Sequence, residues 1–185
     1  MKAAIVGCGN IAAVHAKSIS LLDGVTLTAV SDIKMDRAEK YEREYGCRAC
    51  DSLEKMLEEE RPDVLHICTP HYLHVPMAQY ALKKGIHVFS EKPPVISEEQ
   101  LTCLEKAVAE GPGRAGFCFQ NRYNPSVLFV KKLLASGKAG KVKGARGIVT
   151  WHRDAATIRK AAGEESWKPR EEARCSISPF TPWTC

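Results

Sequence analysis

Two glycines and an alanine lie where the first apolar run of the chain meets its first helical pattern. The segment VGCGNIA places Gly7, Gly9 and Ala12 in a G-x-G-x-x-A arrangement. The first glycine allows a sharp turn, the second keeps side-chain atoms away from a diphosphate, and the alanine lets the helix pack close to the strand. The helix starts near Asn10 and Ile11, and its free N–H groups and dipole favour an anion. We therefore predict a dinucleotide site at these residues, with a merely tight turn as the alternative.

A carboxylate follows the second apolar run. Asp32 ends the segment VTLTAVSD, about 20 residues beyond the glycines, where a carboxylate can accept hydrogen bonds from both hydroxyls of a ribose. The same charge repels a 2′-phosphate, so the sequence favours NAD over NADP as the cofactor. Lys34 and Arg37 are close enough to weaken that preference, so NADP stays open. The alternative role for Asp32 is that of a helix cap.

A longer segment, CTPHYLHVPMAQYALKKGIHVFSEKPP, carries polar groups at the ends of two further apolar runs. Thr69 and Pro70 follow one run, and Glu91 and Lys92 follow the next. The carboxyl ends of parallel strands meet at the edge of an open α/β sheet where ligands bind. Taken alone, a lysine between glutamate and proline is more often a solvated surface charge. A histidine at a strand-to-helix turn, such as His74, is usually a cap or a partly buried filler.

This segment closely resembles the signature of the Gfo/Idh/MocA oxidoreductases, the family of glucose–fructose oxidoreductase and inositol dehydrogenase. Their N-terminal Rossmann domain typically carries C-T-P-x-x-x-H…A-x-x-G-x-H-V-x-x-E-K-P. The matching positions in this chain are Thr69, Pro70, His74, Gly85, His87, Glu91, Lys92 and Pro93. Together with the glycine turn and FQNRYNP at 119–125, the resemblance covers residues 1 to about 154.

The resemblance implies roles for single residues. Thr69 and Pro70 would line the cofactor cleft, and His74 would be the family's cofactor-side histidine. Glu91 would contact the ribose beside the nicotinamide, while Lys92 would reach the reacting oxygen of the substrate. A cationic donor there favours the alkoxide-like charge that develops as hydride leaves carbon.

Two further positions follow from the same resemblance. Gln120 and Arg122 would close the nicotinamide side of the site. His71 stands where the family often has asparagine, and it could neighbour the nicotinamide without a catalytic part. We predict Lys92 as the catalytic residue.

The elements that must position these groups alternate along the chain. Apolar runs predict strands at 2–6, 25–32, near 48, 63–70, 86–93, 115–122 and 141–154. Helical patterns and stop signals predict helices at 11–24, 34–46, 52–60, 74–85, 97–111 and 125–137. On the first helix we place Ile11, Val14, Ile19 and Leu22 on one side. The alternation predicts an α/β fold of Rossmann type, a mainly parallel sheet with helices on both faces.

Composition argues against two classes of partner. The net charge is +5 among 185 residues, but lysine and arginine are dispersed among acidic residues, so we expect no nucleic-acid binding. No apolar run approaches the ~20 residues of a membrane span, and the first strand begins at once without a signal segment, so we expect no membrane association.

The eight cysteines show no zinc spacing, and we expect no metal site. Cys47 and Cys50 form C-x-x-C, and we expect this pair to flank a short strand. Four others lie singly in apolar stretches, where cysteine is usually a small buried side chain: Cys8, Cys68, Cys103 and Cys118. Reduced thiols and a cytoplasmic chain are the expectation.

The ending PREEARCSISPFTPWTC shows neither a helix nor a strand period. In the family, W-R-G and then G-G-G…I-H-x-x-D-L follow the first domain, and the His and Asp of that motif usually complete the catalytic group. Here WHRDAA at 151–156 begins the expected segment, and the resemblance then stops. A shifted reading frame permits YYSEGGWRGKLETE and then GGGAVLNQSIHTLDL up to Cys185. We therefore predict that 155–185 are an out-of-frame, disordered tail, with a genuine divergent tail as the alternative.

These inferences predict three parts: an NAD(P)-binding Rossmann domain at 1–122, the start of a second, substrate domain at 123–154, and the tail. The rest of that α+β domain would be missing. The parent reaction would transfer hydride between a nicotinamide cofactor and a CH–OH group of a sugar, inositol or related polyol, and truncation would impair or abolish it here. Alternatives are a non-catalytic dinucleotide-binding or scaffolding module completed by a partner chain, and biliverdin-reductase-like chemistry. The oligomeric state is left open.

Overall fold

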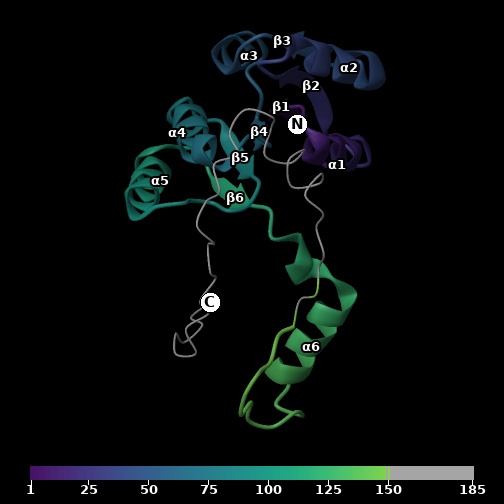
Figure 1. Cartoon of the computed structure of the whole chain (residues 1–185), viewed down its shortest axis with the longest axis vertical. Helices are drawn as coiled ribbons and strands as arrows, with labels where there is room; N and C mark the ends of the chain where they lie inside the picture. The colour runs from purple at the N-terminus through teal and green to yellow at the C-terminus, as the bar shows by residue number, and fades with distance from the viewer. Residues whose placement is uncertain (149, 151–185) are drawn as a thin grey trace. The chain divides into compact units, whose positions relative to one another are not determined.

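Six parallel strands form one sheet in the computed structural model, which describes residues 1–148 and 150 (Figure 1). The strands are β1 (Lys2–Val6), β2 (Thr26–Ser31), β3 (Arg48–Cys50), β4 (Val64–Ile67), β5 (His87–Ser90) and β6 (Ala115–Phe117). Their order is β3-β2-β1-β4-β5-β6, and every neighbouring pair is parallel. This is the strand order of the dinucleotide-binding Rossmann fold, so the predicted fold class is confirmed.

The helices alternate with these strands as predicted. They are α1 (Asn10–Ser20), α2 (Met35–Tyr45), α3 (Leu53–Glu60), α4 (His74–Lys83), α5 (Glu98–Glu110) and α6 (Pro125–Ala135), with short 3₁₀ turns η1 (His71–Leu73) and η2 (Gln120–Tyr123). Ser52 and Ser97 cap α3 and α5, each side chain accepting a hydrogen bond from a backbone N–H three residues on. Gly46 ends α2 in the left-handed conformation.

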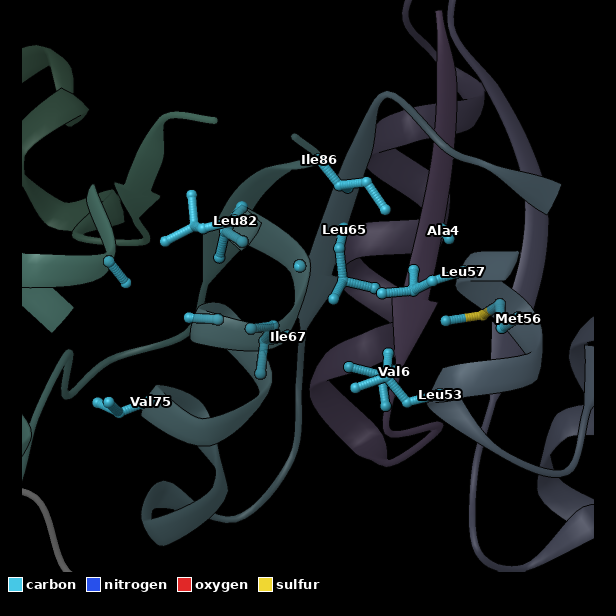
Figure 2. Close-up of a cluster of buried hydrophobic side chains, with 14 of the residues drawn as sticks. Ala4, Val6, Leu53, Met56, Leu57, Leu65, Ile67, Val75, Leu82 and Ile86 are labelled. Carbon is cyan, nitrogen blue, oxygen red and sulfur yellow. The ribbon is translucent and has the colours of Figure 1, made fainter. Parts of the chain in front are cut away.

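The strands bury residues on both faces because helices cover both. Side chains alternate along β1, so Ala3 and Ile5 join the core under α1 and α2, whereas Ala4 and Val6 join the core under α3, α4 and α5. Figure 2 shows this second core, to which Leu57 of α3 and Ala4 of β1 both belong. Helices α4 and α5 also pack against each other.

Three expectations about single elements were wrong. On α1 the buried residues are Ala12, His15, Ala16 and Ile19, whereas Val14 and Leu22 are exposed. The alanines explain this, because small side chains let the helix lie close to the sheet. The strand predicted at 115–122 ends at Phe117, since the chain then turns into η2.

The third concerns the strand predicted at 141–154. Residues 141–148 and 150 form no strand, because no described strand pairs with them. The remaining positions of that prediction, and the out-of-frame hypothesis for 155–185, fall outside the described residues. The compact unit around the sheet runs from Met1 to Ala135, and the domain boundary predicted at residue 122 stays a prediction.

The sheet order fixes where a ligand can bind. From β1 the chain moves outward through β2 to β3, and then returns to place β4 on the other side of β1. Connections leaving β1 and β4 therefore diverge to opposite faces and open a crevice at the carboxyl ends of these strands. Gly7 follows β1, Thr69 follows β4, and Glu91 follows β5, so all three stand at this edge. No described helix is long and apolar enough to cross a bilayer.

Candidate dinucleotide-binding site

The turn after β1 requires glycine at its first position. Gly7 has a φ of +88°, and its N–H donates to the Ser31 carbonyl at 2.8 Å. A Cβ on Gly7 would lie 2.7 Å from the carbonyl oxygen of Cys68 and 3.0 Å from a methyl carbon of Thr69. The turn therefore passes directly over the end of β4, which is possible only without a side chain.

The second glycine faces open space. Gly9 is the N-cap of α1 with an ordinary φ of −81°, and a Cβ there would meet nothing within 4 Å. No side chain caps the helix, so the N–H groups of Asn10 and Ile11, both exposed residues, point out of an uncapped N-terminus. Tyr41 holds the turn from behind, its hydroxyl donating to the Gly9 carbonyl at 3.1 Å. This main chain can accept a diphosphate in contact with it.

Both carboxylate oxygens of Asp32 accept backbone hydrogen bonds, one from the glycine turn and one from the segment after β2. Oδ2 accepts from the N–H of Cys8 at 2.7 Å, and Oδ1 accepts from the N–H of Lys34 at 2.8 Å. Each oxygen keeps a further lone pair, so these bonds leave room for the hydroxyls of a ribose. Burial, and next the Asp32 charge, raise the pKa of the Cys8 thiol to about 12, so this thiol is neutral.

A cavity of about 240 Å³ lies beside this turn. Its lining comes from the first turn of α1, the segments after β4 and β5, both 3₁₀ turns and the start of α4: Ile11, Thr69, His71, His74, Glu91, Lys92 and Gln120. Six of these seven are residues that the sequence predicted for the site. Ligand pockets usually measure roughly 300–1,000 Å³, so this cavity suits one end of a dinucleotide and not the whole molecule.

His74 lines this cavity and connects two of the segments that form it. The residue is 1% exposed, and its ring nitrogens lie 2.9 Å from the carbonyl oxygens of Thr69 and Pro93. The imidazole thereby ties the end of β4 to the segment after β5. Its geometry is that of a residue that positions the two segments on which Thr69 and Lys92 stand.

Glu91 is buried, and both of its carboxylate oxygens have protein partners. Oε1 lies 3.1 Å from Nε2 of His15, and Oε2 accepts from the N–H of Lys92 at 3.2 Å. His15 in turn contacts His66, with 2.9 Å between the two Nδ1 atoms. Burial, and next the ring of His15, lower the pKa of His66 to about 4.

The sequence interpretation missed His15, His66 and Tyr41. A signal existed for His15, because its spacing from Ala12 and Ile19 puts all three on one face of α1. A polar side chain on a buried stripe needs a partner, and here that partner is Glu91. Nothing in the local sequence pointed to His66 or Tyr41.

The structure also places the other predicted positions, Lys92, Gln120, Arg122 and Pro70, near the ends of β4, β5 and β6. Lys92 is exposed, and no described carboxylate forms an ion pair with it. Gln120 lies on η2 and lines the cavity, whereas Arg122 stacks over the ring of Phe119, 5.3 Å from its centroid. Pro70 starts the turn that leads into α4, its carbonyl accepting from Leu73 at 2.9 Å.

One group of potential metal ligands lies next to the cavity. A ring nitrogen of His15, a carboxylate oxygen of Glu91 and Sγ of Cys118 lie within 4.8 Å of one another. The first two already share a hydrogen bond, and burial followed by the Glu91 charge raises the pKa of the Cys118 thiol. These contacts account for the group without a cation, and the absence of a metal stays a prediction. The six cysteines in the described residues are all free. Contrary to expectation, Cys103 is exposed and Cys118 half-buried, whereas Cys47, just before β3, and Cys50, its last residue, are buried.

Known proteins resemble this chain over the part that carries the site. Residues 1–115 match the family described as an oxidoreductase family with an NAD-binding Rossmann fold. Glucose-6-phosphate 3-dehydrogenase of Bacillus subtilis is 28% identical over 173 residues, which are 88% of this chain and 49% of that protein. Inositol 2-dehydrogenase of Rhizobium meliloti is 30% identical over 75% of this chain and 42% of its own length. The chain thus spans under half the length of these relatives.

A solved structure agrees in fold. The WlbA dehydrogenase of Bordetella pertussis, crystallised with NADH and UDP-GlcNAcA, superposes with a TM-score of 0.73 and 32% identity, over 76% of this chain and 41% of that one. The family match spans β1 to the start of β6, and so includes the glycine turn, Asp32 and the Glu91–Lys92 pair. The chain belongs to the Gfo/Idh/MocA family of oxidoreductases, whose members carry an NAD-binding Rossmann fold.

Proposed function

We propose that this chain binds NAD(H) across the carboxyl edge of its sheet. The observation that carries the proposal is the opening at Gly9, where uncapped N–H groups of α1 face space that no side chain enters. The diphosphate would rest there, with the adenine ribose on Asp32 and the nicotinamide end in the cavity lined by Thr69, Glu91 and Lys92. A relative crystallised with NADH and another named as a dehydrogenase support NAD(H) as the ligand.

We propose further that the bound nicotinamide exchanges hydride with a CH–OH carbon of a sugar, inositol or related polyol. The substrate class rests on the relatives, which act on glucose 6-phosphate and inositol. Lys92 is exposed at the cavity, so its amino group can reach the substrate oxygen. As the neutral amine it would accept the proton that the hydroxyl loses on oxidation, and as the ammonium it would return this proton on reduction. Glu91, fixed at both oxygens, would orient the ribose next to the nicotinamide.

NAD is favoured over NADP because Asp32 carries its charge where a 2′-phosphate would lie. The half-buried carboxylate is held by two backbone N–H groups, so it cannot easily turn away from that phosphate. Lys34 and Arg37 stand nearby and lessen the repulsion.

Titration calorimetry of the full chain with NADH and NADPH tests this proposal. We expect NADH to bind more tightly than NADPH. The substitution Asp32→Asn, which removes the charge and keeps the shape of the side chain, should lower the ratio of the two affinities by about tenfold, or ~1.4 kcal/mol. Asp36→Asn on the exposed first turn of α2 is the matched control and should leave the ratio unchanged. Failure of both dinucleotides to bind the folded wild-type chain would refute the function itself.

A second candidate is a dinucleotide-binding module that another chain completes. One observation favours it: helix α6 leaves its apolar side chains exposed, namely Val127, Leu128, Phe129, Val130, Leu133 and Leu134. Exposed apolar patches of this kind mark contact surfaces. Size-exclusion chromatography with light scattering, comparing wild type with Phe129→Asp, would detect such a partner or a self-association; an unchanged mass would count against it.

A further inference from the structure

A chain of polar side chains runs behind the cavity from Glu91 through His15 to His66. His15 and Glu91 come from α1 and from the residue after β5, and their side chains are only 5% and 9% exposed. His66 lies on β4, between Ile5 of β1 and Phe89 of β5 in the register of the sheet. The three residues thus connect the helix of the glycine turn with the strand end that carries Lys92.

The donor and acceptor roles at Glu91 are fixed by chemistry. An ionised carboxylate only accepts hydrogen bonds, so Nε2 of His15, at 3.1 Å from Oε1, must carry a proton and donate it. The N–H of Lys92 donates to the other oxygen at 3.2 Å. The carboxylate is therefore held at both ends, once by α1 and once by its own segment.

The ring of His15 is itself held in place. His66 is neutral down to about pH 4, because burial and then the His15 ring lower its pKa, so it has one ring proton. One of the two Nδ1 atoms therefore donates and the other accepts across 2.9 Å. The rings meet edge to face at 5.2 Å between centroids, and Phe89 contacts both, at 5.9 Å from His15 and 5.2 Å from His66. Among the described residues, the thiols of Cys118 and Cys68 are further titratable groups close enough to Glu91 to feel its charge.

We propose that His15 is a positioning residue that fixes Glu91 for the nicotinamide half of the cofactor, and that His66 sets the orientation of the His15 ring. This inference rests on the proposed function. Helix α1 would then contact both halves of the cofactor site. Its N-terminus at Gly9 faces the diphosphate, and His15 on its buried face holds the Glu91 carboxylate beside the nicotinamide ribose. The two halves of the dinucleotide are then linked through one rigid element.

Comparing NADH with ADP isolates this role. ADP carries the adenosine and the diphosphate but lacks the nicotinamide and its ribose. In calorimetric titrations of the full chain, His15→Leu should weaken NADH binding by about tenfold, the usual cost of losing a hydrogen bond to a charged group, and change ADP binding by less than about twofold. His15→Gln should restore most of the NADH affinity, because its amide can donate near the position of Nε2.

His66→Phe is the second variant, since it keeps the ring packing against Phe89 and removes only the nitrogen contact. We expect it to weaken NADH by about threefold with ADP unchanged. Equal losses for NADH and ADP would show that His15 merely holds α1, and unchanged NADH affinity in His15→Leu would show that Glu91 needs no support; either result overturns the inference. A wild-type chain that binds NADH no more tightly than ADP would also overturn the inference. A folded wild-type chain that binds neither ligand would instead refute the proposed function.

Discussion

Replacing Gly7 by alanine should destabilise the whole fold. The residue has a φ of +88°, where an alanine costs roughly 1–2 kcal/mol. Its new Cβ would also lie 2.7 Å from the Cys68 oxygen and 2.8 Å from the Cys68 carbonyl carbon. Neither atom can yield easily, because the N–H of Cys68 bonds the Val6 carbonyl at 2.9 Å. Overpacking of this kind adds about 1–3 kcal/mol, so the free energy of unfolding should fall by roughly 2–5 kcal/mol.

Gly24→Ala separates the two costs. Gly24 has a similar φ of +74°, but a Cβ there meets nothing within 4 Å. Urea unfolding followed by far-UV circular dichroism should show a loss of only about 1–2 kcal/mol for this control. Equal decreases in the free energy of unfolding for Gly7→Ala and Gly24→Ala would refute the argument that the glycine turn packs in contact with the end of β4.

Two further predictions concern stability. The folded pKa of His66, lowered to about 4 by burial and the ring of His15, lies below its unfolded value of about 6.5, so the unfolded chain binds the proton more readily. The contribution of His66 to the free energy of unfolding should be complete above pH 6.5 and decline, by on the order of 3 kcal/mol, as the pH falls to 4. Denaturant titrations at several pH values should show this decline, and the His66→Phe variant should lack it. Ser97→Ala removes the cap of α5, where Oγ accepts from the Gln100 N–H at 3.2 Å, and should lower the free energy of unfolding by about 1 kcal/mol in thermal denaturation.

Each of these has a clear contrary outcome. A wild-type stability curve that is flat between pH 6.5 and 4 would show that His66 is not protected from protonation in the fold. A Ser97→Ala chain that unfolds at the wild-type temperature would show that the hydrogen bond to Gln100 contributes nothing measurable.

Local patterns were sufficient to predict the parallel sheet and the six helices of the described residues. Strand β1, the glycine turn and the caps at Ser52 and Ser97 follow from short-range rules, which act on residues adjacent in the chain. The face of α1 was predicted wrongly because apolar size suggested Ile11 and Val14, whereas close packing on the sheet selected Ala12 and Ala16.

Contacts between polar groups that lie far apart in the chain could not be predicted from the sequence. His15 and Glu91 are 76 positions apart, and His15 and His66 are 51 apart. Only the fold brings these pairs together, and a single sequence contains no signal for their distance. Tyr41, which supports the turn at Gly9 from α2, escaped prediction for the same reason.

The central claim is that a diphosphate lies against bare main chain at Gly9. Gly9→Val tests it, because this position has an ordinary φ of −81° and open space around it, so the variant should fold, with a loss of about 1 kcal/mol because valine is a poor N-cap. Its side chain would stand where the diphosphate must lie. We expect calorimetric titration with NADH, at a temperature where both proteins are folded, to show binding to wild type and at least about tenfold weaker binding to Gly9→Val. Equal affinity of the two folded proteins for NADH would contradict the account.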